Sequence, residues 1–314
     1  MPSVPGRCNS KHFKMLLKEF ISASVASLEK SYSQNEARAI VFRLCEDVLG
    51  TRSYTHIVEP GFVIDKNRLP ELQEKFSRLE SGEPLQYVTG HMQFCGFDFK
   101  VTPDVLIPRQ ETELLCRHAI EFVSRISRMR QSSGKFASPV RALDLCTGSG
   151  CIAWTLALSV PGIEVVATDI SEKALQVARS QNFREYVKAH NIKVPRFVHQ
   201  DVLDTETDPG LGTFDLIVSN PPYVTESEKA LMNKNVLDFE PASALFVPDD
   251  DPMRYYRAIS FWSEKYLAHD GLGLAEVNEA FGGMTAEVFE QGGFVHTDLI
   301  KDINNKVRII RYSR

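Results

Sequence analysis

From Val140 onward the chain alternates short β-branched apolar runs with segments of helical periodicity. We predict strands at residues 140–145, 164–169, 196–200, 214–219, 271–277, 293–300 and 306–312. Helices are predicted between most of them, at residues 150–160, 172–190, 253–269 and 279–291. Strands connected through helices pair in parallel, because the helix carries the chain back across the sheet. The pattern therefore predicts an α/β fold, with helices on both faces of a mostly parallel sheet and the last two strands as an antiparallel edge.

The first 85 residues have helical spacing and no strand-like runs. We predict helices at about 11–30, 34–49 and 67–79. Ser33 and Glu36 have the spacing of a capping box at the start of the helix predicted at 34–49, and Gly50 suits the end of that helix. These residues therefore predict an N-terminal helical bundle (1–85).

A short segment of different composition separates the bundle from the α/β part. Residues 86–107 are aromatic and β-branched residues split by glycines, which predicts a β-hairpin linker. The remaining residues, 108–314, are predicted to form one domain that begins with a helix to about residue 130 and a polar loop at 131–139.

Composition limits the classes of function. The 314 residues carry a net charge of −5, which argues against broad nonspecific nucleic-acid binding and leaves a local basic patch open. The six cysteines include no C-x-x-C pair, so neither structural zinc nor disulfides are expected, and no apolar run approaches the roughly 18 residues of a membrane span. The first eighteen residues are basic and amphipathic, which is typical of a mitochondrial presequence and also of a frayed first helix.

Ligands of parallel sheets bind at the carboxyl ends of the strands. The first strand ends in DLCTGSGC, where Gly148 and Gly150 allow a tight turn before a helix. With Ala153 this turn also fits the dinucleotide pattern of dehydrogenases, or a plain packing turn. Asp169 ends the second strand, where it can accept hydrogen bonds from ribose hydroxyls or act only as a charge at a helix start. Asp201 after the third strand can accept from an adenine amino group beside Val202, or be a surface acid.

The fourth strand ends in IVSNPPYV, in which two prolines stop the strand and fix the backbone. An amide or ring amino nitrogen is a poor nucleophile, because its lone pair is delocalised. The side-chain oxygen of Asn220 can accept a hydrogen bond from one hydrogen of this nitrogen, and the Pro221 carbonyl can accept one from the other. The Tyr223 ring can pack against a planar group. The segment is therefore interpreted as a holder for a planar NH2 group, which is how such a nitrogen is prepared for methylation.

The chain resembles class I S-adenosylmethionine-dependent methyltransferases, and more narrowly the HemK/PrmC family of protein-(glutamine-N5) methyltransferases. The matching blocks span nearly the whole chain: EPLQYVTG at 83–90, F-x-G-x-x-F at 94–99, VLIPRQETE at 105–113, DLCTGSGCIA, NPPY, and a closing Lys301-Asp302 with Arg308. The resemblance implies a seven-stranded Rossmann-like fold and methyl transfer to the glutamine of the GGQ loop of a peptide-chain release factor.

The resemblance also implies the site residues. The cofactor S-adenosyl-L-methionine falls on Thr147, Gly148, Ser149, Gly150, Cys151, Asp169, Val202 and Asn220, joined by Asp201 from its place after the third strand. The acceptor glutamine falls on Asn220, Pro221, Pro222 and Tyr223. Arg109 and Glu111 are expected near the methionine end of the cofactor, or ordering the linker, or in an interdomain ion pair.

Three positions depart from the family pattern. Gln110 replaces a frequent proline, the acidic run Asp249–Asp251 replaces glycine-rich sequence at the rim, and Asn278 follows the fifth strand where a glycine is usual. None belongs to the predicted glutamine holder.

The N-terminal bundle resembles the bacterial and organellar branch of the family, and with the basic start it indicates the mitochondrial matrix, with a bacterial-type cytoplasm as the alternative. The expected partner is a release factor gripped by the bundle, and the expected state is a monomer without bound metal or nucleic acid. NPPY also occurs in adenine amino-methyltransferases of DNA, which remain the main alternative. A non-catalytic cofactor-binding module and a dehydrogenase are the others.

Overall fold

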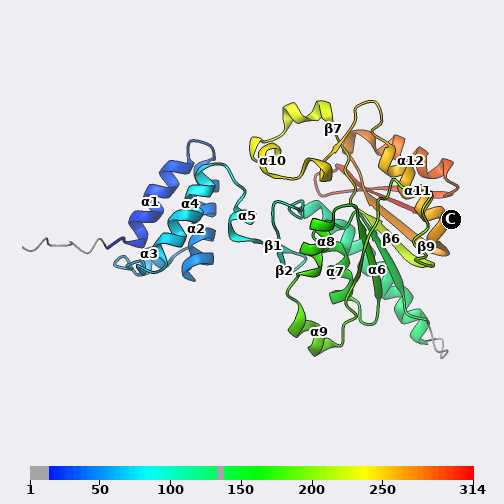
Figure 1. Ribbon diagram of the computed structural model, residues 1–314, viewed down its shortest axis with the longest axis horizontal. Coiled ribbons are helices and arrows are strands. Elements are labelled where there is room, and N and C mark those ends of the chain that lie inside the picture. Colours follow the sequence, from blue (N-terminus) through cyan, green and yellow to red (C-terminus); the bar gives the residue numbers. More distant parts are fainter. Residues whose placement is uncertain (1–13, 133–137) are drawn as a thin grey trace, which may run out of the picture. The chain divides into compact units, whose positions relative to one another are not determined.

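The computed structural model describes residues 14–132 and 138–314 (Figure 1). Contacts divide the chain into two compact units, residues 1–89 and 90–314, whereas the sequence suggested a boundary after Leu85. Most of the presequence-like segment (1–13) and the centre of the predicted polar loop (133–137) lie outside the described residues. No helix in the described ranges is both long and apolar enough to cross a bilayer.

The first unit is built from helices α1 (Leu17–Leu28), α2 (Gln34–Leu49), α3 (Thr55–Val58), α4 (Leu69–Glu80) and α5 (Leu85–Thr89). Ser33 accepts a hydrogen bond from the backbone N–H of Glu36, and Gly50 ends α2 with φ of 68°, which confirms both predicted ends of this helix. The first helix starts later than predicted, because Leu16 is extended and pairs with Val63. Apolar faces of α1, α2 and α4 pack into one core.

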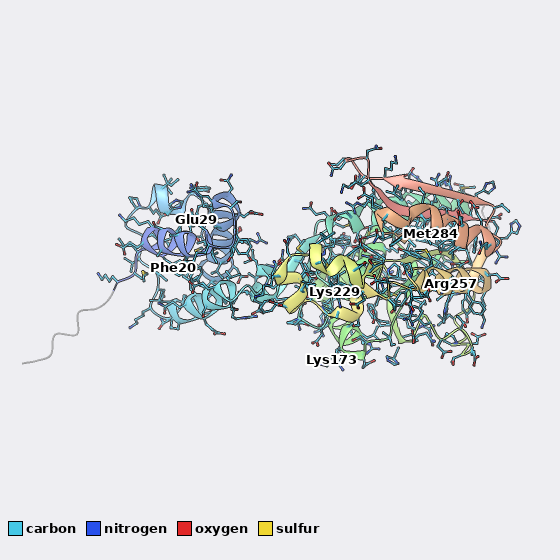
Figure 2. All side chains as sticks on the ribbon, turned by 90° about the horizontal axis from the view of Figure 1, so that it is seen from above. Phe20, Glu29, Lys173, Lys229, Arg257 and Met284 are labelled. Atoms are coloured by element: carbon cyan, nitrogen blue, oxygen red, sulfur yellow. The ribbon has the colours of Figure 1, made fainter. Side chains whose placement is uncertain are left out.

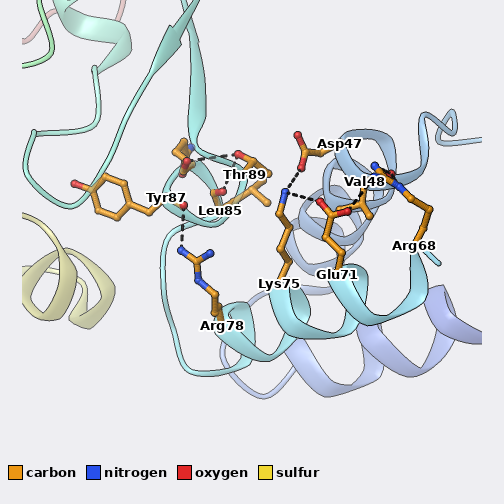
Figure 3. A network of polar contacts seen from close by, with 10 residues as sticks. Asp47, Val48, Arg68, Glu71, Lys75, Arg78, Leu85, Tyr87 and Thr89 are labelled. Carbon is orange, nitrogen blue, oxygen red and sulfur yellow. Dashed lines mark hydrogen bonds and ion pairs between the residues drawn. The ribbon is translucent and has the colours of Figure 1, made fainter. Parts of the chain in front are cut away.

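Polar contacts fasten α4 to its neighbours in the bundle (Figure 3). The Lys75 ammonium lies 2.7 Å from Asp47 of α2, and the Arg68 guanidinium donates to the carbonyl of Val48, 2.9 Å from Nε. Arg78 donates to the carbonyl of Tyr87 at 3.2 Å, within the unpredicted helix α5. The start of the predicted hairpin linker is therefore helical and belongs to the bundle.

The hairpin itself is confirmed as β1 (His91–Phe94) and β2 (Phe97–Lys100), which pair antiparallel. Its two-residue turn has positive φ at Cys95 and Gly96, 49° and 80°, as a tight hairpin requires. Glu113 accepts the Cys95 N–H at 2.8 Å. Gln181 bonds both the N–H and the carbonyl of Lys100, at 2.8 and 3.0 Å, so the hairpin is fixed to the α/β unit.

The second unit has a seven-stranded sheet of order β10-β11-β9-β6-β3-β4-β5. The strands are β3 (Arg141–Leu145), β4 (Glu164–Asp169), β5 (Arg196–His199), β6 (Phe214–Ser219), β9 (Leu267–Glu276), β10 (His296–Lys301) and β11 (Val307–Ser313). Five neighbouring strands of this sheet are parallel, in the order β9, β6, β3, β4 and β5. Strand β11 pairs antiparallel with β9 and β10. The predicted mostly parallel sheet with an antiparallel edge is confirmed.

Alternate residues of the strands face two separate cores. Leu216 and Val218 of β6 pack in the core beneath α6 (Gln110–Ser132) and α7 (Cys151–Ser159). Ile217, between them, packs in the other core, which contains residues of α11 (Arg254–Tyr266) and α12 (Gly282–Gln291). Helices therefore cover both faces, as predicted from the alternation of strands and helices along the chain.

Two segments of the second unit differ most from the sequence prediction. The helix expected at 172–190 is two helices, α8 (Glu172–Arg179) and α9 (Arg184–His190), because the backbone between them turns Phe183 into the core against Trp154. The segment between β6 and α11 was not assigned structure from the sequence. It contains the short elements β7 (Val224–Thr225), η1 (Glu226–Leu231), α10 (Lys234–Phe239), η2 (Ala242–Ala244) and β8 (Phe246–Val247).

Candidate active site

A pocket of about 300 Å³ lies at the carboxyl ends of β3, β4 and β6. It is lined by residues 103–106 and 108, Thr112, 146–149, 151 and 152, 169–171, 173 and 174, 201 and 202, Asn220, Pro222, Pro241, 243 and 244, and Tyr255. Its volume is at the lower end of the range for small-molecule sites. The position is the one that the strand order predicts for a ligand.

One wall is the glycine-rich turn between β3 and α7. Gly150 has φ of 78°, and a Cβ there would lie 3.0 Å from that of Ala178, so only glycine fits without a shift. The Asp144 carboxylate oxygen Oδ2 accepts from the Thr147 hydroxyl at 2.6 Å and from the Ala153 N–H at 3.2 Å. Asp144 therefore ties both ends of the turn from inside the protein.

Two carboxylates form the next part of the wall. Asp169 accepts the Gly148 N–H at 2.8 Å on Oδ2 and the Ser171 N–H at 2.9 Å on Oδ1, so both oxygens are held in place. Burial raises the pKa of this carboxyl above its ordinary value, and the bonds to Ser171 and Gly148 oppose the rise. Asp201 accepts the Leu203 N–H at 2.8 Å, and Val202 beside it is buried. The carboxylates are thus preorganised as acceptors against an apolar surface.

The Asn220 side chain is fixed by residues from two distant elements. Its Nδ2 donates to the Thr112 hydroxyl of α6 at 3.1 Å, and that hydroxyl donates to Glu276 Oε2 of β9 at 2.7 Å. The Tyr223 hydroxyl donates to Oε1 of the same carboxylate at 2.7 Å. Burial raises the pKa of Glu276 above its ordinary value, and the two hydroxyls oppose the rise. A buried carboxylate therefore joins both ends of the NPPY segment.

The segment between β7 and β8 also lines the pocket, through Pro241, Ser243 and Ala244. Glu240 is buried, accepts the Arg109 guanidinium at 2.6 Å on one oxygen, and accepts the Ile107 N–H at 3.2 Å on the other. Lys229 of η1, labelled in Figure 2, lies 4.2 Å from the centre of the Phe246 ring. The contacts of Glu240 hold this segment, next to Pro241, against the residues that precede α6.

Most of the residues predicted from the sequence lie at this pocket. Its lining includes Thr147, Gly148, Ser149, Cys151, Asp169, Asp201, Val202, Asn220 and Pro222. Within the described ranges, the lining does not include Gly150, Pro221, Tyr223, Arg109 or Glu111. Gly150 and Pro221 are buried, and Tyr223 lines a second hollow with Asn278 and Arg308. The chemical roles of all these residues stay predictions.

Arg109 and Glu111 have partners inside the second unit. Arg109 pairs with Glu240, and Glu111 lies 3.9 Å from Arg308. The expected pair between domains is therefore wrong for both residues. Asn278 has φ of −64° and accepts the Ala280 N–H, so its position does not require the glycine usual in the family.

Sequence reasoning missed several residues of the site. Thr112 lies in the block at 105–113, but neither it nor Glu240 gave any sign of its contacts, because their partners are more than a hundred residues away. Ile170 and Tyr255 add apolar and aromatic surface to the pocket without any local motif, and Leu106 does so from within the block at 105–113. These contacts depend on the tertiary fold.

Comparisons with known proteins identify relatives of this chain. A family model described as the Methyltransferase small domain matches residues 129–240. A release factor glutamine methyltransferase of Bacteroides thetaiotaomicron is 38% identical over 92% of this chain and 96% of its own length. The one of Flavobacterium psychrophilum is 33% identical over 95% of this chain and 99% of its length. Among solved structures, the release factor-specific protein-(glutamine-N5) methyltransferase of Alicyclobacillus acidocaldarius is 26% identical, with a TM-score of 0.39 over 69% of this chain and 99% of that chain.

The family model and the mostly parallel seven-stranded sheet confirm the predicted class I methyltransferase fold. Both bacterial relatives are more than 30% identical over nearly their full lengths. The chain is therefore a methyltransferase that belongs to the release factor glutamine methyltransferase family.

Proposed function

We propose that this protein transfers a methyl group from S-adenosyl-L-methionine to the side-chain amide nitrogen of the glutamine in a GGQ loop of a peptide-chain release factor. The observation that carries the proposal is the fixed amide of Asn220 at the edge of the pocket, 3.1 Å from Thr112. The names of the bacterial relatives supply the acceptor.

The residues of the pocket fit the proposed cofactor. Asp169 retains acceptor capacity for ribose hydroxyls beyond its two backbone bonds, and Asp201 can accept from an adenine amino group. Val202 and Ile170 supply apolar surface for a flat ring, and the turn at Gly148 lets the backbone approach closely. When bound there, S-adenosyl-L-methionine supplies a sulfonium methyl group that a neutral nitrogen can accept.

The NPPY corner supplies orientation. A carboxamide nitrogen accepts a methyl group poorly unless its hydrogens are held and its lone pair is directed. The Asn220 oxygen and the Pro221 carbonyl are proposed to accept the two hydrogens, while Tyr223 bounds the flat group. Orientation of this kind contributes up to about 7–11 kcal/mol in well-aligned systems. The extra proton can leave to water after transfer, so the proposal needs no general base.

The helical bundle is proposed to bind the release factor away from its GGQ loop. A separate role is supported by its packing, because the bundle has a hydrophobic core of its own. We also propose that the protein acts as a monomer, which light scattering of the purified protein tests directly.

A mitochondrial matrix setting is proposed on the basic, amphipathic first eighteen residues. The bacterial sources of the relatives favour the alternative of a bacterial-type cytoplasm. Potential-dependent uptake by isolated mitochondria would support the matrix, and lack of uptake would overturn it.

A transfer assay tests the proposed function. The purified protein is incubated with methyl-labelled S-adenosyl-L-methionine and a GGQ release factor, and the glutamine peptide is examined by mass spectrometry. We expect one added methyl group on that glutamine and none on a matched protein with Gln→Ala in the loop. Label on the Ala protein, or transfer to adenine in duplex DNA in preference to the release factor, would refute the assignment.

A further inference from the structure

A buried polar chain runs behind the NPPY corner from α6 to β9. Thr112 and Glu276 are each 1% exposed, and both carboxylate oxygens of Glu276 accept a hydroxyl, from Thr112 and from Tyr223. Burying a carboxylate is costly unless it is fully hydrogen-bonded. An apolar pair of similar shape would fill this space at lower cost, so the carboxylate indicates a role beyond packing.

The donors and acceptors of this chain fix the orientation of the Asn220 amide. A threonine hydroxyl has one hydrogen, and Thr112 donates it to Glu276. Only lone pairs of Thr112 Oγ1 then remain for Asn220, so the group facing it must be the NH2. The amide oxygen of Asn220 consequently points away from Thr112. Glu276, which does not line the pocket within the described ranges, thus determines which way an amide at the pocket points.

We propose that Glu276 is a positioning residue, which acts through Thr112 to hold the Asn220 oxygen toward the acceptor amide. This inference rests on the proposed function and adds the element that selects one of the two amide orientations. If position 276 holds a glutamine or a protonated glutamate, that side chain can donate a hydrogen bond to the Thr112 hydroxyl. The Thr112 hydroxyl is then free to donate to Asn220, which favours the reversed amide and presents NH2 where an acceptor is needed.

The anchoring of Tyr223 on the same carboxylate extends the effect to the other end of the corner. The Asn278 side chain also donates to the Tyr223 carbonyl at 3.2 Å, so the backbone of the corner has a support independent of Glu276. A change confined to the carboxylate should therefore disturb the two side chains more than the prolines between them.

The test uses the full chain and the near-isosteric variants Glu276→Gln and Thr112→Val, with Thr112→Ser as the conservative variant. Thr285→Val is the matched control, because Thr285 is also buried in a helix. Among the residues that the structure describes, its hydroxyl bonds only to the Phe281 carbonyl and, weakly, to Met253. Turnover on a GGQ release factor, cofactor affinity by calorimetry and melting temperature are measured for each.

Glu276→Gln and Thr112→Val are expected to lower kcat by about 10- to 100-fold, because a change that misplaces a reacting group by about 1 Å can cost about 100-fold. Cofactor affinity should change less than about threefold, because the residues holding Asp169 are untouched. Thr112→Ser should restore most of the turnover, and Thr285→Val should match the parent. A Glu276→Gln protein with parental kcat overturns the proposal. The proposal is also overturned if the variants lose cofactor affinity by the same factor as kcat, or if their melting temperatures fall far below that of the parent. Either result would indicate a purely structural role.

The side-chain NH2 signals of Asn220 in ¹⁵N NMR give a readout independent of methyl transfer. They should shift in Glu276→Gln and Thr112→Val and stay in place in Thr285→Val. If the parent protein methylates no GGQ substrate, the proposed function fails, and these signals still decide the orienting role of Glu276. Unchanged signals in Glu276→Gln overturn that role whatever the activity.

Discussion

The fully buried carboxyl of Asp144 is expected to make the α/β unit less stable as the pH rises. Its Oδ2 accepts from Thr147 and Ala153, but its Oδ1 has no hydrogen-bond partner among the described residues. Burial raises the pKa of Asp144 from 3.8 to about 7, the two hydrogen bonds oppose the rise, and the charge of Asp169 adds to it. The carboxyl therefore binds a proton in the folded state at pH values where the unfolded chain has lost it.

The difference between the folded and unfolded pKa of Asp144 gives the sign and the size of its contribution to the free energy of unfolding. Because the folded pKa exceeds the unfolded one, stabilisation is full below about pH 3.8 and is lost as the pH rises to about 7. A shift of about 3 units at 1.36 kcal/mol each corresponds to roughly 4 kcal/mol in total. Part of this is already lost at about pH 5, which leaves roughly 3 kcal/mol to be lost between about pH 5 and pH 9.

Urea unfolding of the parent and of Asp144→Asn at the two pH values measures this loss. The asparagine keeps an oxygen for Thr147 and Ala153 and cannot ionise. Both tryptophans of the chain, Trp154 and Trp262, lie in the α/β unit, so their fluorescence reports this unit. The difference between the two proteins removes the contributions of other carboxyls with raised pKa values. Parallel pH dependences in the parent and the variant would refute the argument, because they would mean that Asp144 keeps one protonation state throughout.

Further predictions concern the site. Asn220→Ala should lower kcat by about 100-fold or more, as loss of one directed polar group commonly does, with cofactor affinity nearly intact by calorimetry. Asp169→Ala should instead weaken cofactor binding by about 10- to 100-fold, the range of a charge-assisted hydrogen bond. Glu240→Gln removes the charge that Arg109 pairs with and should raise the KM for S-adenosyl-L-methionine more than it lowers kcat, measured in the same assay. Deleting residues 1–85 should raise the KM for a whole release factor more than for a short GGQ peptide, and an equal rise for both would contradict a binding role for the bundle.

The parts of the fold that the sequence predicted correctly have local causes. The ends of α2 depend on Ser33 and Gly50, whose side-chain oxygen and positive φ act within one turn of the helix. The strands of the parallel sheet are continuous apolar runs, because both of their faces are buried. The ends of these strands then locate the pocket without further information.

The parts that were missed depend on distant residues. The break between α8 and α9 follows from the packing of Phe183 on Trp154, which a run of helical spacing does not reveal. The segment from Val224 to Val247 contains only short elements, held by contacts such as that of Glu240 with Arg109. Propensity is weak over such lengths, so tertiary contacts determine their structure.

Glu276 illustrates the same limit at the site itself. In the sequence, Glu276 ends the fifth strand two residues before an asparagine in place of the usual glycine, and no pattern there marks it as buried. In the fold its carboxylate is buried because hydroxyls from α6 and from the NPPY corner arrive on both of its oxygens. Asn220 alone allows two amide orientations of similar shape, and only one of them presents an acceptor. The NPPY motif alone therefore does not fix the orientation of the Asn220 amide. The residues that fix it lie 108 positions earlier, at Thr112, and on β9, at Glu276.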